Sequence, residues 1–299
     1  MNVSQLIATS FVTGAELGVI ALGLSLSYAV LRFTNFAHVE LVTVGAYVAW
    51  AAVKAGVPLI PAALVAMLLA GVLAMAIDFI VFRRLRQASA GGKMIASVGV
   101  GLVIRTLVQI AFGTEPQDFP AVSSSLPPVL GARITTLQVA IIALTLTSMV
   151  VLWLVLYRTK MGTALRAAAD NFPLALARGV AGEQTISFMW FLSGVFAAFG
   201  GILIALETVL TPSIGSFVIM PAFASASVGG LGSPYGAVAG ALTLAFGQNI
   251  LVSVDFGSLL GVGPWRLSPN YKDAIALGAL ILTLLIRPSG LLSPRTARR

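Results

Sequence analysis

Long apolar stretches without any charged side chain are the feature of this sequence that most restricts its fold. Residues 137–157 and 185–206 are two clear examples, and about 20 apolar residues are enough to cross the hydrocarbon core of a bilayer. Only 9% of the residues are charged, whereas a soluble globular protein has about a quarter. Further apolar spans lie at 11–31, 36–53, 59–82, 94–112, 216–230, 234–253 and 272–286. We therefore expect an all-α polytopic membrane protein with eight or nine membrane-embedded helices, forming a single domain over residues 1–299.

The basic residues indicate how these spans are oriented. Residues 83–93, 158–183 and 287–299 each carry four Lys or Arg, together 12 of the 18 basic residues. Basic loops stay on the cytoplasmic side of a membrane, which explains the net charge of +8 without a nucleic acid partner. The connection 113–136 holds Glu115, Asp118 and a single Arg133, so we expect it outside. Nine full crossings would place the N-terminus outside and the C-terminus in the cytoplasm.

Two short interruptions separate spans that have almost no loop between them. They read RFTNFAHVE at 32–40 and GGLGSPYG at 229–236. Irregular backbone at membrane depth must be buried in protein or line a watery cavity, so broken or re-entrant helices would fit at both places. Paired helix breaks are a pointer to the binding site of secondary transporters. Asn35, His38 and Glu40 at the first break could either line a solute path or form a polar cap in which Asn35 satisfies the amides that begin the next helix.

The segment 158–183 is the longest polar interruption between two clear spans. It carries a helical run GTALRAAAD, a break at Pro173 and a second short helix ending at Gly179. A helix–turn–helix on a membrane surface can be an amphipathic linker lying in the headgroups or a docking surface for a soluble partner. Interfacial anchors favour Trp, Phe and Leu on one face, whereas this segment is mostly Ala with Gly. Its composition favours the docking surface.

Enzyme chemistry finds little support in the sequence. There is no cysteine and a single histidine, His38, so a thiolate or multi-histidine metal site is not expected. The run Gly91-Gly92-Lys93 does not complete a phosphate loop, because Gln87 and Met94 occupy two positions that the motif requires to be Gly and Ser or Thr. We expect no catalytic residues, metal or cofactor. Among ionisable residues inside the spans, Asp78 is expected to pair near Arg83 at a span end, and Arg105 to face protein or water.

Four longer motifs occur in order along the chain. They are GLSLSYAVLRFTNFAHVELVTVGAY, MGTALRAAADNFPLALARGVAG, SASVGGLGSPYGAVAGAL and KDAIALGALILTLLIRPSGLL. Together they resemble the LivH-type permease of branched-chain amino acid ABC importers, over residues from about 14 to 293. Two departures stand out. Val39 follows the signature histidine where the family usually has Gly, and Val-Ala-Gly-Glu follows Gly179 where the family more often has Ile-Asn-Val.

The resemblance implies a multi-pass permease subunit in the bacterial inner membrane, which is itself not an enzyme. Its implied partners are a LivM-type second permease, two ATPase subunits, an extracytoplasmic solute-binding protein, membrane lipid and an amino acid substrate. The substrates that the resemblance implies first are branched-chain amino acids, and urea, short amides or other amino acids are the alternatives. A channel or secondary carrier that needs no ATPase is the rival class. By matching positions, the residues of the coupling segment that would contact the ATPase are Met161, Gly162, Arg166, Ala167, Asp170 and Gly179. The residues that would form the translocation path are Asn35, His38, Glu40, Gly229, Gly230, Gly232 and Ser233.

Overall fold

The computed structural model describes residues 3–120, 124–128, 131–256, 261, 265–287 and 289–291. Within these residues the structure consists of helices and connections, with isolated bridges in place of strands. The elements in chain order are α1 (Val3–Leu31), α2 (Ala37–Lys54), α3 (Leu59–Ile77), the π-helix η1 (Asp78–Phe82), α4 (Ala90–Phe112), α5 (Thr136–Arg158), α6 (Lys160–Asp170), α7 (Phe172–Ala177), α8 (Gly182–Glu207), α9 (Ile214–Gly229), α10 (Pro234–Ser253), the 3-10 helix η2 (Pro269–Tyr271) and α12 (Lys272–Ile286). Seven of the described helical segments are long and apolar enough to cross a membrane, and α9 is a shorter apolar helix. The prediction of an all-α polytopic membrane protein is confirmed.

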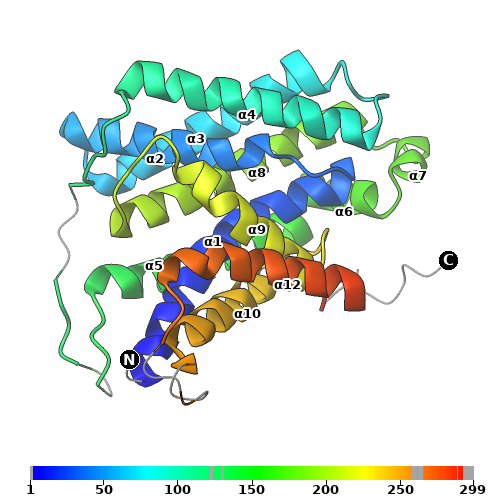
Figure 1. The fold of residues 1–299 in the computed structure, drawn as a ribbon. Coiled ribbons are helices and arrows are strands. Elements are labelled where there is room, and N and C mark those ends of the chain that lie inside the picture. The colour runs from blue at the N-terminus through cyan, green and yellow to red at the C-terminus, as the bar shows by residue number, and fades with distance from the viewer. Residues whose placement is uncertain are drawn as a thin grey trace.

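Helices α1 and α8 form the centre of the molecule (Figure 1). Helix α1 packs mainly against α10 and α8, and α8 in turn packs against α2 and α3. Glycines allow these close approaches. A Cβ added at Gly201 of α8 would lie 2.1 Å from the Val42 carbonyl oxygen, and one at Gly45 of α2 would lie 2.3 Å from the Cα atom of Ala198. Larger residues at these positions would push the two helices apart.

The segments predicted to be cytoplasmic lie at one end of the molecule. Helices α6 and α7 and the C-terminal end of α12 share one side in Figure 1. Two further connections lie at the same end. Arg32 of the α1–α2 connection donates to the Ala169 carbonyl oxygen of α6. Arg86 of the connection before α4 lies 3.5 Å from Glu183 in the first turn of α8. At the opposite end, Trp50 Nε1 donates to the Asp118 carbonyl oxygen over 3.1 Å. The sidedness inferred from the basic residues agrees with this arrangement, although residues 292–299 lie outside the described part of the chain.

Helix α2 begins inside the bundle and not at its end. The backbone N–H of Phe36, just before α2, donates to Ser97 Oγ of α4 over 3.0 Å. Ser97 lies seven residues into α4, which is roughly two turns. The connection before α2 is therefore irregular backbone at membrane depth, and it is buried at Phe33 and Asn35, as such backbone must be. The break expected near 32–40 is thus a short non-helical connection that enters the bundle.

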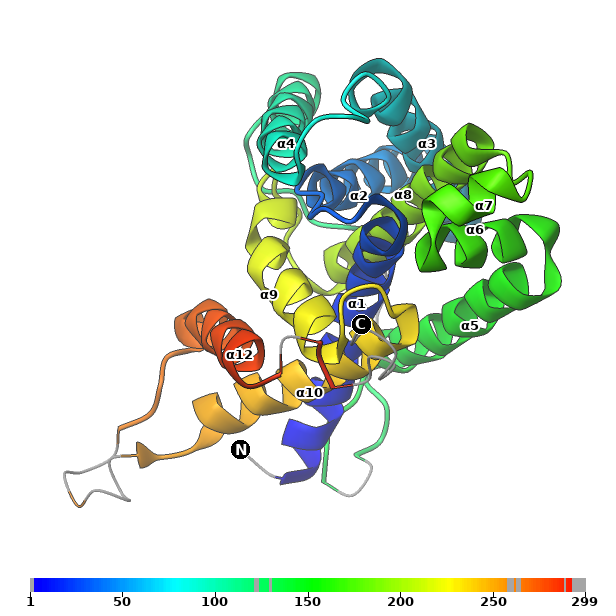
Figure 2. The ribbon, with the colours of Figure 1, turned by 90° about the vertical axis from the view of Figure 1, so that its right-hand side faces the viewer.

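Helix α9 also begins inside the bundle, but the chain reaches its start from the opposite end of the molecule. The backbone N–H of Gly215 donates to Thr43 Oγ1 of α2 over 3.0 Å. Arg105, which contacts the start of α9, lies seven residues before the end of α4 at Phe112, again roughly two turns. Two helix N-termini therefore lie at membrane depth beside α4. Figure 2 shows α4, α9 and α12 along one side of the molecule.

Candidate functional site

The predicted coupling segment forms two short helices with capped starts. The Thr159 hydroxyl accepts a hydrogen bond from the Gly162 N–H over 2.9 Å, which starts α6. The Asn171 side chain accepts from the Leu174 N–H over 3.1 Å, which starts α7 with Pro173 in its first turn. Caps of this kind satisfy the free amides of a helix start. Gly179 follows α7 with a φ of +86°, a backbone conformation that favours glycine. The predicted pair of short helices is confirmed, but the break between them lies at Asn171, and Pro173 belongs to the first turn of α7.

The six residues assigned to coupling differ in what they face. Gly162 is buried against α5, where an added Cβ would lie 2.1 Å from the Val155 carbonyl oxygen. Met161 and Ala167 are half-buried, and Arg166, Asp170 and Gly179 are exposed. The Arg166 guanidinium lies over the Tyr157 ring, 4.5 Å from its centroid. Gly162 therefore holds α6 on α5, while Arg166 and Asp170 belong to the free surface of the segment.

Helix α7 contributes apolar side chains to that surface. Leu174 and Leu176 are 54% and 46% exposed. Sequence reasoning missed them because it treated the segment as Ala- and Gly-rich. The signal was present in the run FPLALA, which places two leucines in an otherwise polar and basic connection.

A cleft of about 440 Å³ joins the coupling segment to the second predicted break. Arg166 and Asp170 of α6 line one wall, and Gly232 and Ser233 of the α9–α10 turn line another. Arg32 also lines the cleft and anchors α6 through its bond to Ala169. Two sets of residues far apart in the sequence therefore meet at the cytoplasmic end.

The second break itself is a turn held by glycines. Gly230 and Gly232 have φ values of +114° and +91°, and the Ser233 hydroxyl caps α10 by accepting from the Gly236 N–H over 3.2 Å. A Cβ added at Gly229 would lie 1.8 Å from the Gly236 carbonyl oxygen. These residues shape the turn and its tight packing.

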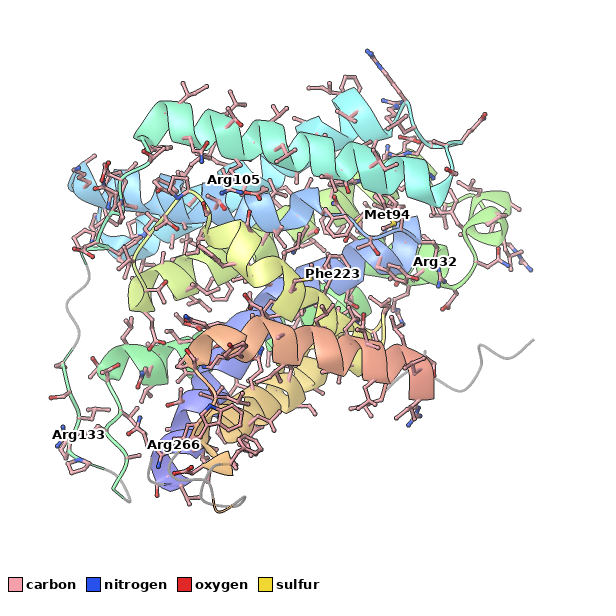
Figure 3. All side chains as sticks on the ribbon, viewed as in Figure 1. Arg32, Met94, Arg105, Arg133, Phe223 and Arg266 are labelled. Atoms are coloured by element: carbon pink, nitrogen blue, oxygen red, sulfur yellow. The ribbon has the colours of Figure 1, made fainter. Side chains whose placement is uncertain are left out.

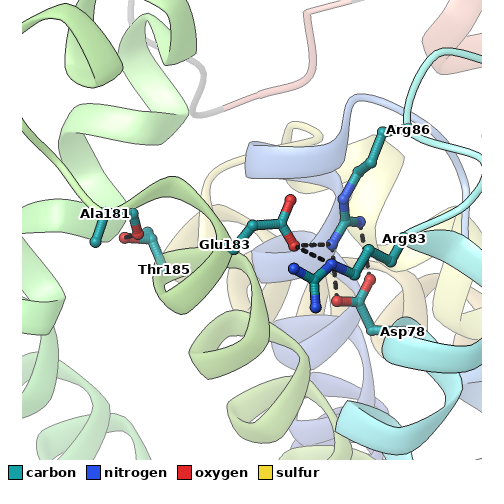
Figure 4. A network of polar contacts seen from close by, with 6 residues as sticks. All are labelled: Asp78, Arg83, Arg86, Ala181, Glu183 and Thr185. Carbon is teal, nitrogen blue, oxygen red and sulfur yellow. Dashed lines mark hydrogen bonds and ion pairs between the residues drawn. The ribbon is translucent and has the colours of Figure 1, made fainter.

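An ion-pair network fixes the beginning of α8, just after the coupling segment (Figure 4). The Asp78 carboxylate accepts two hydrogen bonds from Arg86, each 2.8 Å. Glu183 lies 3.4 Å from Arg83 and 3.5 Å from Arg86. Burial by itself would lower the pKa of Arg86, but the hydrogen bond and charge of Asp78, followed by those of Glu183, raise that pKa overall. The expected partner of Asp78 was near Arg83, whereas its direct partner is Arg86.

Asn35 and His38 of the first signature are buried structural residues. The Asn35 side chain accepts a hydrogen bond from the Ala37 N–H, the first amide of α2, over 3.2 Å, as the polar-cap alternative expects. The N-cap residue Phe36 itself makes no side-chain capping hydrogen bond. His38 is fully buried. Its Nδ1 lies 2.9 Å from Ser193 Oγ of α8, and its Nε2 lies 3.1 Å from the Ile20 carbonyl oxygen of α1. His38 thus joins three helices, and a role in the solute path stays a prediction.

Glu40 belongs to a polar cluster that also contains Arg105, which is labelled in Figure 3. Its carboxylate accepts from Ser216 Oγ of α9 over 3.2 Å and from Thr43 Oγ1 over 3.4 Å. Arg105 of α4 donates to Ser216 Oγ over 3.0 Å and to Ser213 Oγ over 2.6 Å. Arg105 thus faces protein, as expected for an ionisable residue within a span. The sequence did not reveal that Arg105 and Glu40 share one serine.

Metal chemistry has no support in the part of the chain that the structure describes. No group of three His, Cys, Asp or Glu side chains there could hold a metal ion.

Comparison with protein families gives one match that covers most of the chain. The family model described as the permease component of branched-chain amino acid transport systems matches residues 6–284. The match extends from α1 to α12 and includes the coupling segment, both helix breaks and the polar cluster.

Curated relatives match over nearly the whole chain. A probable branched-chain amino acid transport permease protein LivH of Methanocaldococcus jannaschii is 31% identical, covering 91% of this chain and 87% of the relative. The high-affinity branched-chain amino acid transport system permease protein LivH of Escherichia coli K12 is 28% identical, covering 93% and 92%. The corresponding permease BraD of Pseudomonas aeruginosa is 27% identical, covering 96% and 95%.

One solved structure shares the fold. A chain of PsaBC from Streptococcus pneumoniae, solved in complex with a Fab, superposes with a TM-score of 0.50 at 16% sequence identity. The superposition covers 96% of this chain and 92% of that one, so the likeness concerns the arrangement of the helices along the entire chain.

Proposed function

This chain belongs to the family of branched-chain amino acid transport permeases, and from that premise we propose that it imports amino acids as half of a two-permease unit whose transport is coupled to ATP hydrolysis through α6 and α7. The family is the multi-pass membrane subunit of ABC importers, which work with ATPase and binding-protein components. It is a transport component and not an enzyme. The proposal adds a LivM-type second permease, two ATPase subunits and residues with specific roles.

The observation that carries the proposal is the surface presented by α6 and α7. Arg166, Leu174 and Leu176 are exposed there, and the segment is anchored behind by Gly162 and Arg32. An exposed planar guanidinium suits carboxylates or carbonyl oxygens of a protein partner, and exposed leucines add apolar contact area. We place the ATPase subunit on this face, with Met161, Ala167, Asp170 and Gly179 around the contact.

The second permease would pack along the side formed by α4, α9 and α12 (Figure 2). Large apolar side chains are exposed on this side, including Leu107 of α4, Phe217 of α9 and Ile281 of α12. Arg105 and Ser216 are only half-buried between α4 and α9. A solute path between the two permeases would run past these polar residues. In this proposal Glu40 supports the path directly, whereas Asn35, His38 and the glycine turn with Ser233 shape the helices that form it.

Branched-chain amino acids are the substrates that the names of the relatives support. Urea or a short amide would be a neutral substrate with no charge to satisfy Arg105. The arginine at membrane depth therefore favours a substrate that carries a negative group. An importer is expected to move such amino acids only when ATPase subunits and ATP are present, which separates it from an independent channel or carrier.

The test is a charge reversal on the proposed docking face. We expect Arg166→Glu to reduce co-purification of the ATPase subunits and binding-protein-stimulated ATP hydrolysis in vesicles. Loss of one partner of a buried charged hydrogen bond at an interface costs about 2–5 kcal/mol, and a cost of about 3 kcal/mol weakens association more than a hundredfold. The stability of the permease should change little, because an exposed cation–π contact such as that with Tyr157 contributes about 0.5–1 kcal/mol.

Arg84→Glu is the matched control, since Arg84 is an exposed arginine in the turn after η1, outside the proposed docking face. It should retain its ATPase partners. Gly162→Leu provides a contrast: it should destabilise the permease by about 1–3 kcal/mol, because the new side chain would meet the backbone of Val155 and Leu156. If Arg166→Glu keeps its ATPase subunits and full stimulated hydrolysis, the segment is a surface linker and the coupling assignment fails.

A further inference from the structure

Arg105 is an arginine at membrane depth whose surroundings resemble a ligand site more than an ion pair. It lies on α4, between α2 and the start of α9 (Figure 3). No carboxylate of the described residues lies within ion-pair distance of it, and its hydrogen bonds in that part of the chain go to two serine hydroxyls. A guanidinium has five N–H donors, so two such bonds leave donors available. A charge in this position is costly and usually serves function.

The two serine hydroxyls that accept hydrogen bonds from Arg105, those of Ser213 and Ser216, lie at the start of α9. Ser213 occupies the N-cap position but makes no capping hydrogen bond with its side chain. Its hydroxyl instead accepts from the Arg105 guanidinium over 2.6 Å. The N-terminus of a helix carries partial positive charge from its amides. Arg105 and the start of α9 therefore place two sources of positive potential side by side.

The Glu40 carboxylate is close to Arg105 but already engaged. It accepts from Ser216 and Thr43 and is buried. Its hydrogen-bond link to Arg105 runs through Ser216, and its charge also acts on the guanidinium directly. Ser216 therefore bridges the two charges, donating to Glu40 and accepting from Arg105. This arrangement balances the arginine charge without covering the guanidinium, and Arg105 itself remains half-buried.

We propose that Arg105, with the Ser213 hydroxyl and the start of α9, binds the α-carboxylate of the amino acid as it passes through the membrane. This inference rests on the proposed function, since it needs a solute path along α4 and α9. A planar guanidinium matches a carboxylate in shape and charge and can bind both of its oxygens. The same chemistry, with helix N-termini directed at a substrate carboxylate, operates in transporters with discontinuous helices. The site recognises the group common to all amino acids, so it does not select among their side chains.

The experiment uses the complete importer reconstituted in vesicles: this chain, the second permease, the ATPase subunits and the binding protein. Leucine uptake and ATP hydrolysis are measured together for the native chain, Arg105→Gln and Arg105→Lys. We expect Arg105→Gln to lower the leucine transported per ATP hydrolysed at least about tenfold, equal to about 1.4 kcal/mol, while stimulated hydrolysis persists. Arg105→Lys keeps the positive charge but not the planar geometry, so it should restore part of the ratio.

Gln109→Ala is the matched control, because Gln109 is a half-buried polar residue on the same helix, one turn further along. It should leave the ratio near that of the native chain. A purely structural role for Arg105 predicts a different result: hydrolysis, uptake and thermal stability would all fall together, with Arg105→Lys no better than Arg105→Gln. That result, or an unchanged ratio in Arg105→Gln, would overturn the proposed carboxylate site.

Failure of the site is distinguishable from failure of the proposed function. A native assembly that shows no ATP-dependent leucine uptake would reject the proposed function, and the carboxylate site with it. Native uptake together with an indifferent Arg105→Gln variant would reject the carboxylate site and leave the proposed function standing.

Discussion

Removing Asp78 should destabilise the protein far more than removing Glu183, although both carboxylates contact Arg86. The Asp78 side chain is 2% exposed and makes two 2.8 Å hydrogen bonds to a guanidinium that is 23% exposed. Breaking a buried pair by removing one partner costs about 3–5 kcal/mol. Because Arg86 keeps some access to water, we expect Asp78→Ala to cost about 3 kcal/mol. The Glu183 side chain is 51% exposed and lies 3.5 Å from Arg86, and an exposed pair contributes about 0–1 kcal/mol.

The measurement is unfolding of the purified permease in mild detergent, for the native chain, Asp78→Ala, Glu183→Ala and Arg86→Ala. The double variant of Asp78 and Arg86 completes a cycle that isolates the pair. Equal costs for Asp78→Ala and Glu183→Ala, or a cost for Asp78→Ala below about 1 kcal/mol, would show that burial does not decide the strength of this network.

Two further predictions follow from the arrangement of the helices. In this naturally cysteine-free chain, a membrane-impermeant thiol reagent added outside should label Ser124→Cys but not Thr163→Cys, and labelling at 163 would reverse the topology. His38→Ala should lower the thermal stability of the permease, because it removes buried contacts with Ser193 and the Ile20 carbonyl oxygen and a buried polar group left unpaired costs about 1–3 kcal/mol. Uptake per folded molecule should fall little, so a large loss of uptake at native stability would instead favour a direct role in the solute path.

The features that depend on local sequence were predictable. Apolar runs define the membrane helices because the bilayer fixes their length. Pro173 and Gly179 define the short helices of the coupling segment because each acts on its own backbone. The polar cap at Asn35 was likewise predictable, since the side chain bonds the amide two residues ahead. Each of these inferences needs only neighbours in the chain.

The depth at which α2 and α9 begin was not predictable in the same way. It is marked by Ser97 and Arg105 of α4, which contact backbone or side chains far along the chain. Hydrophobic periodicity does not specify such pairs. The partner of Asp78 was missed for a related reason. The π-helix η1 and the turn after it bring Arg86, and not Arg83, onto the carboxylate.

The contacts of α8 and α2 provide a route by which a motion at the cytoplasmic surface could reach the middle of the membrane. Glu183 at the start of α8 is tied to the loop after η1. Ser193 follows ten residues later on the same helix, roughly 15 Å along its axis, and contacts His38 of α2. Glu40 lies two residues beyond His38 and bonds Ser216 at the start of α9. Because α8 is a continuous helix from Gly182 to Glu207, the ATPase docking that we propose for α6 and α7 would move α2 relative to α9 by shifting the first turn of α8. The starts of α2 and α9, which lie near Arg105, would then move apart or together as ATP is bound and hydrolysed.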